Sequence, residues 1–345
     1  MNSLTKHERP GVYSAYEASA LVQSRDGGAA VGIAARCGGG TADTLYRLSR
    51  YEEAAAAFGA EENMTALIRL LFRNGAAEVY AVPVAAEGGY DAALALLAAT
   101  EGIGVVTCDS TELTVQEKLR ESVKEASAAR RERIAVVSAG DQTVAQLAQR
   151  AESLNSERMV LVGPAAAEGT GAELAAAVAG AIAGESDPAI PLGGAELSGI
   201  GGLSARYGDS EIDTLVRAGV TPVEEMGGIV SVVRGVTTRT KTGEAADVTW
   251  RELTTIRIVD DVIPAVRSAL RAKFRRAKNT EQSRGAIRSQ VVLELENKIS
   301  REIITGYDGV RVSADSENPT VCVVEFSFTV AHGLNQIWLS AHITV

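Results

Sequence analysis

Short runs of apolar residues alternate with longer helix-like segments through the first half of the chain. The runs are Ala29–Ala34, Val79–Val84, Gly104–Cys108, Ile134–Ser138 and Met159–Gly163. The segments with helical spacing are Met64–Phe72, Asp91–Ala99, Thr114–Arg131 and Val144–Ser153, and an Ala-rich segment follows from Ala172. Short apolar runs indicate buried strands. Strands that alternate with helices predict an α/β fold, with a largely parallel sheet and flanking helices.

The pattern changes after Asp187. A loop rich in Gly and Pro comes first, and then a short helix with Ser210 as its expected N-cap and Gly219 at its end. The following elements are a strand over Ile229–Val236 and two helices over Asp260–Lys273 and Ser283–Ile304. Together with the terminal strands, this order predicts a C-terminal α+β domain.

The last residues alternate between apolar and polar to the end of the sequence. In Val321–Val330, one face carries Val324, Phe326, Phe328 and Val330. In Ile337–Val345, one face carries Ile337, Leu339, Ala341, Ile343 and Val345, and the other carries Trp338, Ser340, His342 and Thr344. Alternation with a period of two is typical of a half-buried strand. The pattern alone favours pairing within the strand's own domain. The alternative is an extended strand arm that completes a sheet in another subunit.

The beginning of the chain also has the character of an extended arm. It is polar and contains the turn Arg9-Pro10-Gly11 before Val12. These patterns divide the chain into four parts. They are an N-terminal arm over residues 1–25, an α/β body over 26–225, a C-terminal α+β domain over 226–325 and a C-terminal strand arm over 326–345.

Composition narrows the class of protein. Hydrophobic residues make up 46% of the chain and aromatic residues only 4%, and the large share of alanine and glycine indicates closely packed helices. The three cysteines show no ligand spacing, which favours a reducing compartment. We expect no signal peptide and no membrane insertion, because the longest weakly apolar run, near Ala172–Ala183, is too short to span a bilayer.

The net charge of −10 is unevenly distributed. Residues 1–226 carry a net charge of −13 and residues 227–345 a net charge of +3. An acidic bulk argues against nucleic acid as a partner, because such binding needs a broad basic face. Between Arg267 and Arg288, eight basic residues accompany one acid, Glu281. This segment is either a solvated helix end or a docking surface for an acidic partner.

No motif indicates a catalytic, cofactor or metal site. The loop Ala35–Thr41 contains three adjacent glycines but has neither dinucleotide-binding nor phosphate-loop spacing. All three histidines lie in the terminal segments without ligand spacing. Asp260 and Asp261 are expected at a helix start, where they point apart and complement the helix dipole. The alternative function is a Rossmann-like enzyme that binds a nucleotide or small molecule at the strand ends.

Several stretches, taken in order, resemble the contractile phage tail sheath proteins. They are Arg9–Tyr13, Ala176–Gly184 with Asp187-Pro188, Asp209–Val220, Gly227–Thr240, Trp250–Leu253, Arg257–Asp260 and Lys273-Phe274. The terminal strands agree with this resemblance, which is strongest over residues 175–345 and in the N-terminal arm. It applies equally to a phage, a prophage remnant, a phage-tail-like bacteriocin or another contractile injection system.

The resemblance implies a structural subunit that is not an enzyme and needs no cofactor. Sheath subunits form hexameric rings that stack helically around a tail tube, and exchanged terminal strands link neighbouring subunits while the sheath contracts. The implied partners are other copies of the chain, the tail tube protein, and baseplate and terminator proteins. The implied location is the host bacterial cytoplasm during assembly and then the virion tail or a phage-tail-like particle. The tube protein itself is a third possibility, but such proteins are short and β-dominated.

The resemblance also assigns residues to these contacts. It makes residues 26–225 the outer body and residues 226–325 the inner domain. The expected strand-arm residues are Val12, Tyr13, Tyr16, Phe326, Phe328, Ile337, Leu339, Ile343 and Val345. The expected tube-facing residues are Arg267, Arg271, Arg275, Arg276 and Lys278. Gly333 and the turn at Gly11 are expected to act as hinges for the arms.

Overall fold

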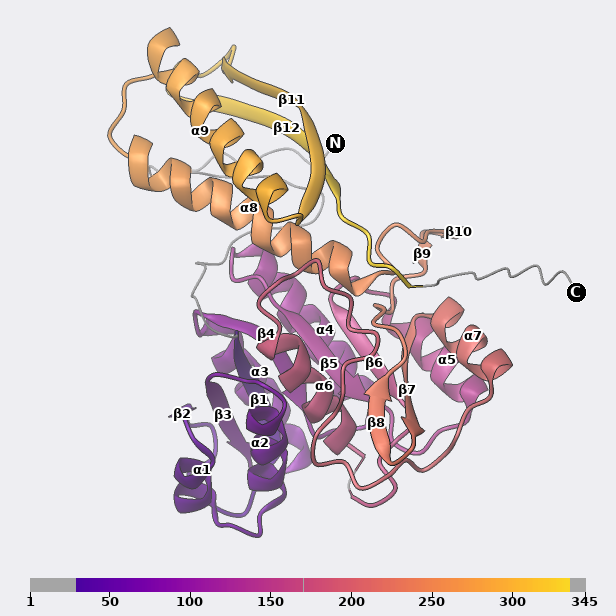
Figure 1. The fold of residues 1–345 in the computed structure, drawn as a ribbon. Coiled ribbons are helices and arrows are strands. Elements are labelled where there is room, and N and C mark those ends of the chain that lie inside the picture. Colours follow the sequence, from indigo (N-terminus) through magenta and orange to yellow (C-terminus); the bar gives the residue numbers. More distant parts are fainter. Residues whose placement is uncertain (1–28, 170, 336–345) are drawn as a thin grey trace, which may run out of the picture.

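A sheet of eight strands forms the centre of the body (Figure 1). The computed structural model describes residues 29–169 and 171–335. The strands are β1 (Ala30–Arg36), β2 (Tyr46–Leu48), β3 (Val79–Val84), β4 (Ile103–Cys108), β5 (Ile134–Ser138), β6 (Met159–Gly163), β7 (Val220–Met226) and β8 (Ile229–Val232). Their order is β2-β3-β1-β4-β5-β6-β7-β8. The strands from β3 to β7 pair in parallel, and β2 and β8 form antiparallel edges.

Helices cover both faces of this sheet. They are α1 (Tyr51–Phe58), α2 (Asn63–Arg73), α3 (Tyr90–Ala99), α4 (Leu113–Ala128), α5 (Val144–Leu154), α6 (Glu173–Gly184) and α7 (Asp209–Ala218). Helices α1, α2 and α6 share a core with one face, and α3, α4, α5 and α7 share a core with the other. The strands alternate between these cores: Val31 and Ile33 belong to the first and Ala34 to the second. The predicted largely parallel sheet with flanking helices is confirmed.

The Ala-rich helix α6 is buried along most of its length because it packs closely against α2. A Cβ atom on Gly180 would lie only 2.6 Å from the carbonyl oxygen of Leu71 in α2. Any residue with a side chain at that position would push the two helices apart. Close helix packing therefore accounts for much of the alanine and glycine in the composition.

A second, smaller domain has its own hydrophobic core. It consists of α8 (Leu253–Phe274), α9 (Glu281–Ser300), β11 (Ile304–Ala314) and β12 (Cys322–Val330). A small hairpin, β9 (Lys241–Thr242) and β10 (Ala245–Ala246), precedes it. Helix α8 connects the two parts: Leu253 and Ile256 belong to a body core, whereas Val262 and Leu270 belong to the core of the C-terminal domain. The predicted α+β character of this domain is confirmed.

The prediction that α8 begins at Asp260 was wrong, because the helix starts seven residues earlier, at Leu253. Its first turns are buried nearly all round, since Thr254, Thr255 and Val259 are enclosed along with the apolar residues. A helix without a solvent-exposed face lacks the apolar and polar periodicity by which helices are detected. Asp260 therefore lies inside the helix, and its negative charge does not act on the helix start.

The two aspartates point apart, as expected, but each forms an ion pair. Asp260 accepts two hydrogen bonds from the buried guanidinium of Arg158, at 2.7 and 2.9 Å. Asp261 accepts one from Lys298 of α9. The first pair fixes α8 to the body, at the loop before β6, and the second fixes α8 to α9. We call the Arg158–Asp260 contact, together with the nearby pair of Glu132 and Arg267, the joint.

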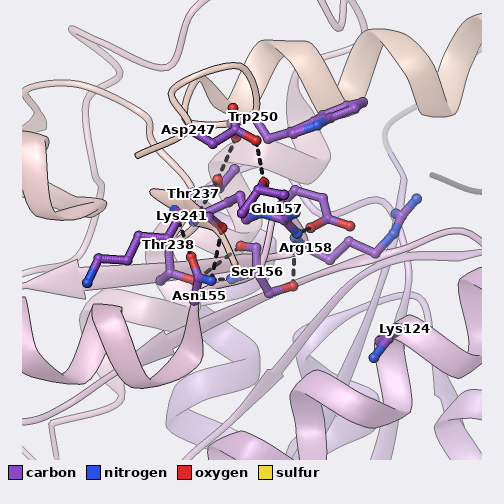
Figure 2. A network of polar contacts seen from close by, with 12 residues as sticks. Lys124, Asn155, Ser156, Glu157, Arg158, Thr237, Thr238, Lys241, Asp247 and Trp250 are labelled. Atoms are coloured by element: carbon purple, nitrogen blue, oxygen red, sulfur yellow. Dashed lines mark hydrogen bonds and ion pairs between the residues drawn. The ribbon is translucent and has the colours of Figure 1, made fainter. Parts of the chain in front are cut away.

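The segment before α8 is fastened to the same loop by polar contacts (Figure 2). The hydroxyl of Thr238 accepts a hydrogen bond from the amide of Ser156 at 3.0 Å and donates one to its carbonyl oxygen at 3.1 Å. Asn155, the left-handed C-cap of α5, donates to the carbonyl of Lys241. The hydroxyl of Thr237 donates to the carbonyl of Trp250 at 2.6 Å. These contacts hold the segment that leads into α8 on the body, in addition to the joint.

Replacing Asp260 with alanine should lower the free energy of unfolding by about 3–5 kcal/mol, because the guanidinium of Arg158 would remain buried without its partner. Asp213→Ala is a matched control that removes an exposed ion pair with Arg217. It should change the free energy by no more than about 1 kcal/mol. Urea denaturation followed by circular dichroism measures both variants, and equal losses would contradict the prediction.

The other half of the joint should make stability depend on pH. Burial raises the pKa of Glu132 from its ordinary 4.5 to about 7, although the charge of Arg267 opposes the shift. The folded protein then keeps a proton that the unfolded chain releases, so stability falls as the pH rises between these two pKa values. Relative to Glu132→Gln, the wild type should lose about 2 kcal/mol between about pH 5 and pH 8. Unfolding free energies of the two proteins across this range provide the test, and a constant difference would refute it.

Candidate assembly surfaces

The strands β11 and β12 form an antiparallel hairpin on the C-terminal domain. Their register runs from Ile304 opposite Val330 to Ala314 opposite Cys322, with irregularities near Gly306 and Asp308. Among the described strands, β11 and β12 pair only with each other, so each has one edge without a strand partner. Such an edge presents a row of N–H and C=O groups to any strand that approaches it.

The two faces of the hairpin differ in character. The inner face packs on the core of α8 and α9 through Ile304, Val310, Phe326 and Phe328, and the last two rings stack with centroids 6.3 Å apart. The outer face carries exposed polar residues. They are Thr305, Asp308, Arg311, Ser313, Glu325, Ser327 and Thr329. The hairpin is therefore a half-buried sheet, anchored on one face and open at both edges.

The structure places the predicted strand-arm residues in two groups. Phe326 and Phe328 lie in β12, and Phe328 pairs with Tyr307 of β11 in the same chain, so both belong to the hairpin and not to a segment that leaves it. The physical reason is their burial against α8 and α9, which an arm residue would lose. The other predicted arm residues lie outside the described residues. They are Val12, Tyr13, Tyr16, Ile337, Leu339, Ile343 and Val345.

Sequence reasoning missed β11 entirely, because it extended the preceding helix to Ile304 and expected no strand after it. Glycines at 306 and 309 interrupt the alternation, and Gly309 has a left-handed φ of 66° at the irregularity in the register. Val310 and Val312 on one face, with Arg311 and Ser313 on the other, were the available signal.

The basic segment is mostly at the surface, with one correction. Arg267 was expected to face a tube, but its side chain is only 2% exposed and lies 3.9 Å from a carboxylate oxygen of Glu132. It belongs to the joint, because its position on α8 turns it towards the body. The remaining predicted residues are exposed at the end of α8 and in the connection to α9. They are Arg271, Arg275, Arg276 and Lys278, which we call the basic patch.

At the place where α/β enzymes bind ligands, an aspartate forms hydrogen bonds within its own chain. Strand order reverses between β1 and β4, and ligands usually occupy the crevice at the carboxyl ends of such strands. There, the carboxylate of Asp109 accepts hydrogen bonds from the hydroxyl of Tyr90 at 2.6 Å and from the amide of Arg36 at 3.0 Å. Asn63 of α2 also donates to it. Asp109 thus ties β1, α2 and α3 together and faces its own chain.

Two hollows border loops of the body, and the first lies beside the loop that follows β5. One of about 450 Å³ is bordered by the starts of α5 and α7, and one of about 240 Å³ lies beside the loop 190–195. Within residues 29–169 and 171–335, no three side chains of His, Cys, Asp or Glu form a group that could hold a metal ion. No helix in this part of the chain has the length and apolar character needed to cross a membrane.

Comparisons with known proteins indicate the family of the chain. Residues 85–238 match the family described as the phage tail sheath protein central domain, and residues 245–344 match the phage tail sheath C-terminal domain. A tail sheath protein of Bacillus phage SP01 is 28% identical over 205 residues, which cover 56% of this chain and 35% of that protein. The chain therefore spans about a third of the length of this relative.

Solved structures share the fold. The helical sheath of the anti-feeding prophage in its contracted state matches with a TM-score of 0.73 and 16% identity, covering 98% of this chain and 99% of that chain. A sheath tail protein from Desulfitobacterium hafniense matches with a TM-score of 0.70 and 11% identity, covering 93% of this chain and 100% of that chain. A sheath tail protein from Listeria innocua matches with a TM-score of 0.72 and 12% identity, covering 91% of this chain and 94% of that chain.

The two family domains match in the expected order and together cover most of the chain, from the sheet of the body to the C-terminal hairpin. Both family models describe domains of phage tail sheath proteins, and the fold agrees with solved sheath structures. The chain belongs to the contractile phage tail sheath family.

Proposed function

We propose that the chain is the structural subunit of a contractile sheath. It polymerises helically around a tail tube, is linked to its neighbours by exchanged terminal strands, and contracts to drive the tube through a target envelope. The observation that carries this proposal is the hairpin β11–β12, a two-stranded sheet on a firm core with one edge of each strand unpaired by any described strand.

The hairpin has the properties of a receiving sheet. Two strands alone are only marginally stable in water, but here α8 and α9 support the inner face. A strand from another subunit would add main-chain hydrogen bonds at an edge without disturbing that core. The alternating segment Ile337–Val345 is suited to this addition because one of its faces is wholly apolar, with Ile337, Leu339, Ala341, Ile343 and Val345. A contact of this heterologous kind, from arm to hairpin, builds an open helical array.

The basic patch supports a second contact of the sheath. Arg271, Arg275, Arg276 and Lys278 are exposed at the end of the domain, remote from the acidic body in sequence. We assign this patch to an acidic surface of the tail tube. Partly solvated charge pairs are individually weak, about 0–1 kcal/mol, so they can hold a ring of subunits and still release on contraction.

A non-enzymatic role agrees with the structure of the α/β body. The polar groups at the strand ends satisfy one another through Asp109, and the family is one of structural proteins. We infer that contraction draws on free energy stored in contacts between bodies and with the tube. The Rossmann-like enzyme remains the alternative, but no described feature favours it.

Deleting Ile337–Val345 should abolish polymerisation and leave the subunit folded. The three hydrophobic cores are built from residues 31–330, so we expect a monomer with near-native circular dichroism and no tubes or rings in negative stain. Leu339→Pro should act similarly, because proline removes a donor from the ladder. Ser340→Ala on the opposite face is the matched control and should assemble. Normal polymerisation of the deletion variant would contradict the strand-exchange proposal.

Reversing Arg275, Arg276 and Lys278 to glutamate should impair assembly on tubes much more than self-assembly of the sheath alone. The reason is repulsion from an acidic tube surface, and high salt should weaken the same contact in the wild type. Reversal of three exposed bases of the body, Arg50, Lys124 and Arg217, changes the net charge equally and serves as control. Counting extended sheaths on tubes by electron microscopy is the measurement. A normal yield from the first variant would leave the patch as a solvated helix end.

A further inference from the structure

The chain that follows β12 returns to the body before it leaves the described structure. Figure 1 shows this segment, in yellow, running from the hairpin back towards the body. The amide of Ala331 donates to the carbonyl of Ile303, which ends the pairing of the hairpin. Two residues later, the backbone of Gly333 lies against the ring of Pro191. A Cβ atom on Gly333 would lie 2.8 Å from the Cβ and 2.9 Å from the Cγ of that proline.

This contact explains why position 333 is glycine. The sequence predicted a hinge, but Gly333 has none of the left-handed φ values found at other glycines of the chain. What the site requires is the absence of a side chain, because a Cβ at these distances would overlap the proline ring. Glycine here permits a close approach, and the close approach restrains the chain instead of freeing it.

Pro191 lies in a loop that is fastened on both sides. Before it, the carboxylate of Asp187 accepts a hydrogen bond from the amide of Ala189 at 2.9 Å, and Ala189 packs on the core of the C-terminal domain. After it, Leu192 is buried in a core of the body, and the amide of Gly194 donates to the carbonyl of Val232 at 2.7 Å. With its φ fixed by the ring as well, Pro191 is a firm point on the subunit.

We propose that Pro191 and Gly333 form an anchor that sets the point from which the C-terminal strand arm leaves the subunit. This inference rests on the proposed strand exchange and adds a residue pair that positions the arm. From Gly333 to the first arm residue, Ile337, the link has three residues, 334–336. Without the anchor, the link would begin after Ala331, the last residue held by the hairpin, and have five.

The anchor raises the effective concentration of the arm near a neighbouring hairpin, because it shortens the link before the arm. The effective concentration of a tethered strand falls roughly as the −3/2 power of the length of its link, so lengthening the link from three to five residues should make each encounter about twofold less frequent. The hydrogen bonds and apolar contacts of the docked strand would be unchanged. Loss of the anchor should therefore slow assembly about twofold and leave the finished sheath intact.

Two variants test the anchor from its two sides. Gly333→Ala displaces the arm, and Pro191→Gly removes the ring against which Gly333 packs. Gly285→Ala is the matched control, because a Cβ at this exposed position of α9 meets nothing within 4 Å. Light scattering at equal protein concentration measures the assembly rate, and negative-stain microscopy checks the product. We expect both anchor variants to assemble about twofold more slowly than the wild type and the control to match it.

Several outcomes would overturn the inference. Wild-type rates for Pro191→Gly would show that the ring positions nothing, even if Gly333→Ala failed to fold. Full rescue of Gly333→Ala by Pro191→Gly in the double variant would show that only crowding matters at this contact. The deletion of Ile337–Val345 separates the two proposals. If that deletion assembles, strand exchange fails; if it is inactive while both anchor variants assemble normally, only the anchor fails.

Discussion

Buried charge on α8 is the constraint on which the arrangement of the two domains depends. Asp260 and Arg267 are enclosed where the helix passes from the body to the C-terminal domain, and each finds its partner on the body, in Arg158 and Glu132. Moving the C-terminal domain on the body would separate Asp260 from the buried guanidinium of Arg158 and leave that charge unpaired, at a cost of about 3–5 kcal/mol. The joint therefore favours a subunit that moves as one piece. In the proposed sheath, any large motion would then fall on the links between subunits.

A stiff subunit places particular demands on those links. A side-chain interface changes its contacts when two bodies rotate, whereas a strand held in a hairpin keeps its ladder as long as the link before it can bend. The hairpin β11–β12 suits this role, because its core is supplied by α8 and α9 and does not depend on what occupies its edges. Open edges are also a hazard, since they invite irregular association. The outer face is polar, with residues such as Asp308, Arg311 and Glu325, so it does not itself associate with other chains. This limits the hazard to the edges of the hairpin.

Sequence patterns predicted the body well and the C-terminal domain less completely, for physical reasons. Buried parallel strands such as Ile134–Ser138 are short apolar runs, and their limits were found almost residue by residue. The start of α8 was missed because two cores enclose it and leave no polar face to detect. The strand β11 was missed because irregular pairing near Gly309 breaks its alternation. Arg267 was assigned to the surface with the other bases, since local composition carries no information about Glu132, far away along the chain.

Gly333 is another residue whose role could not be predicted from the sequence alone. A glycine between two strand-like segments is most simply interpreted as a flexible point, because glycine has the widest range of backbone conformations. Only the three-dimensional structure brings Pro191 to it, from a loop more than a hundred residues earlier. The contact makes Gly333 a restrained point of the chain instead of a hinge. In the proposed strand exchange, a short link that begins at such a firm point suits a stiff subunit, because each body would then offer its strand from a defined position.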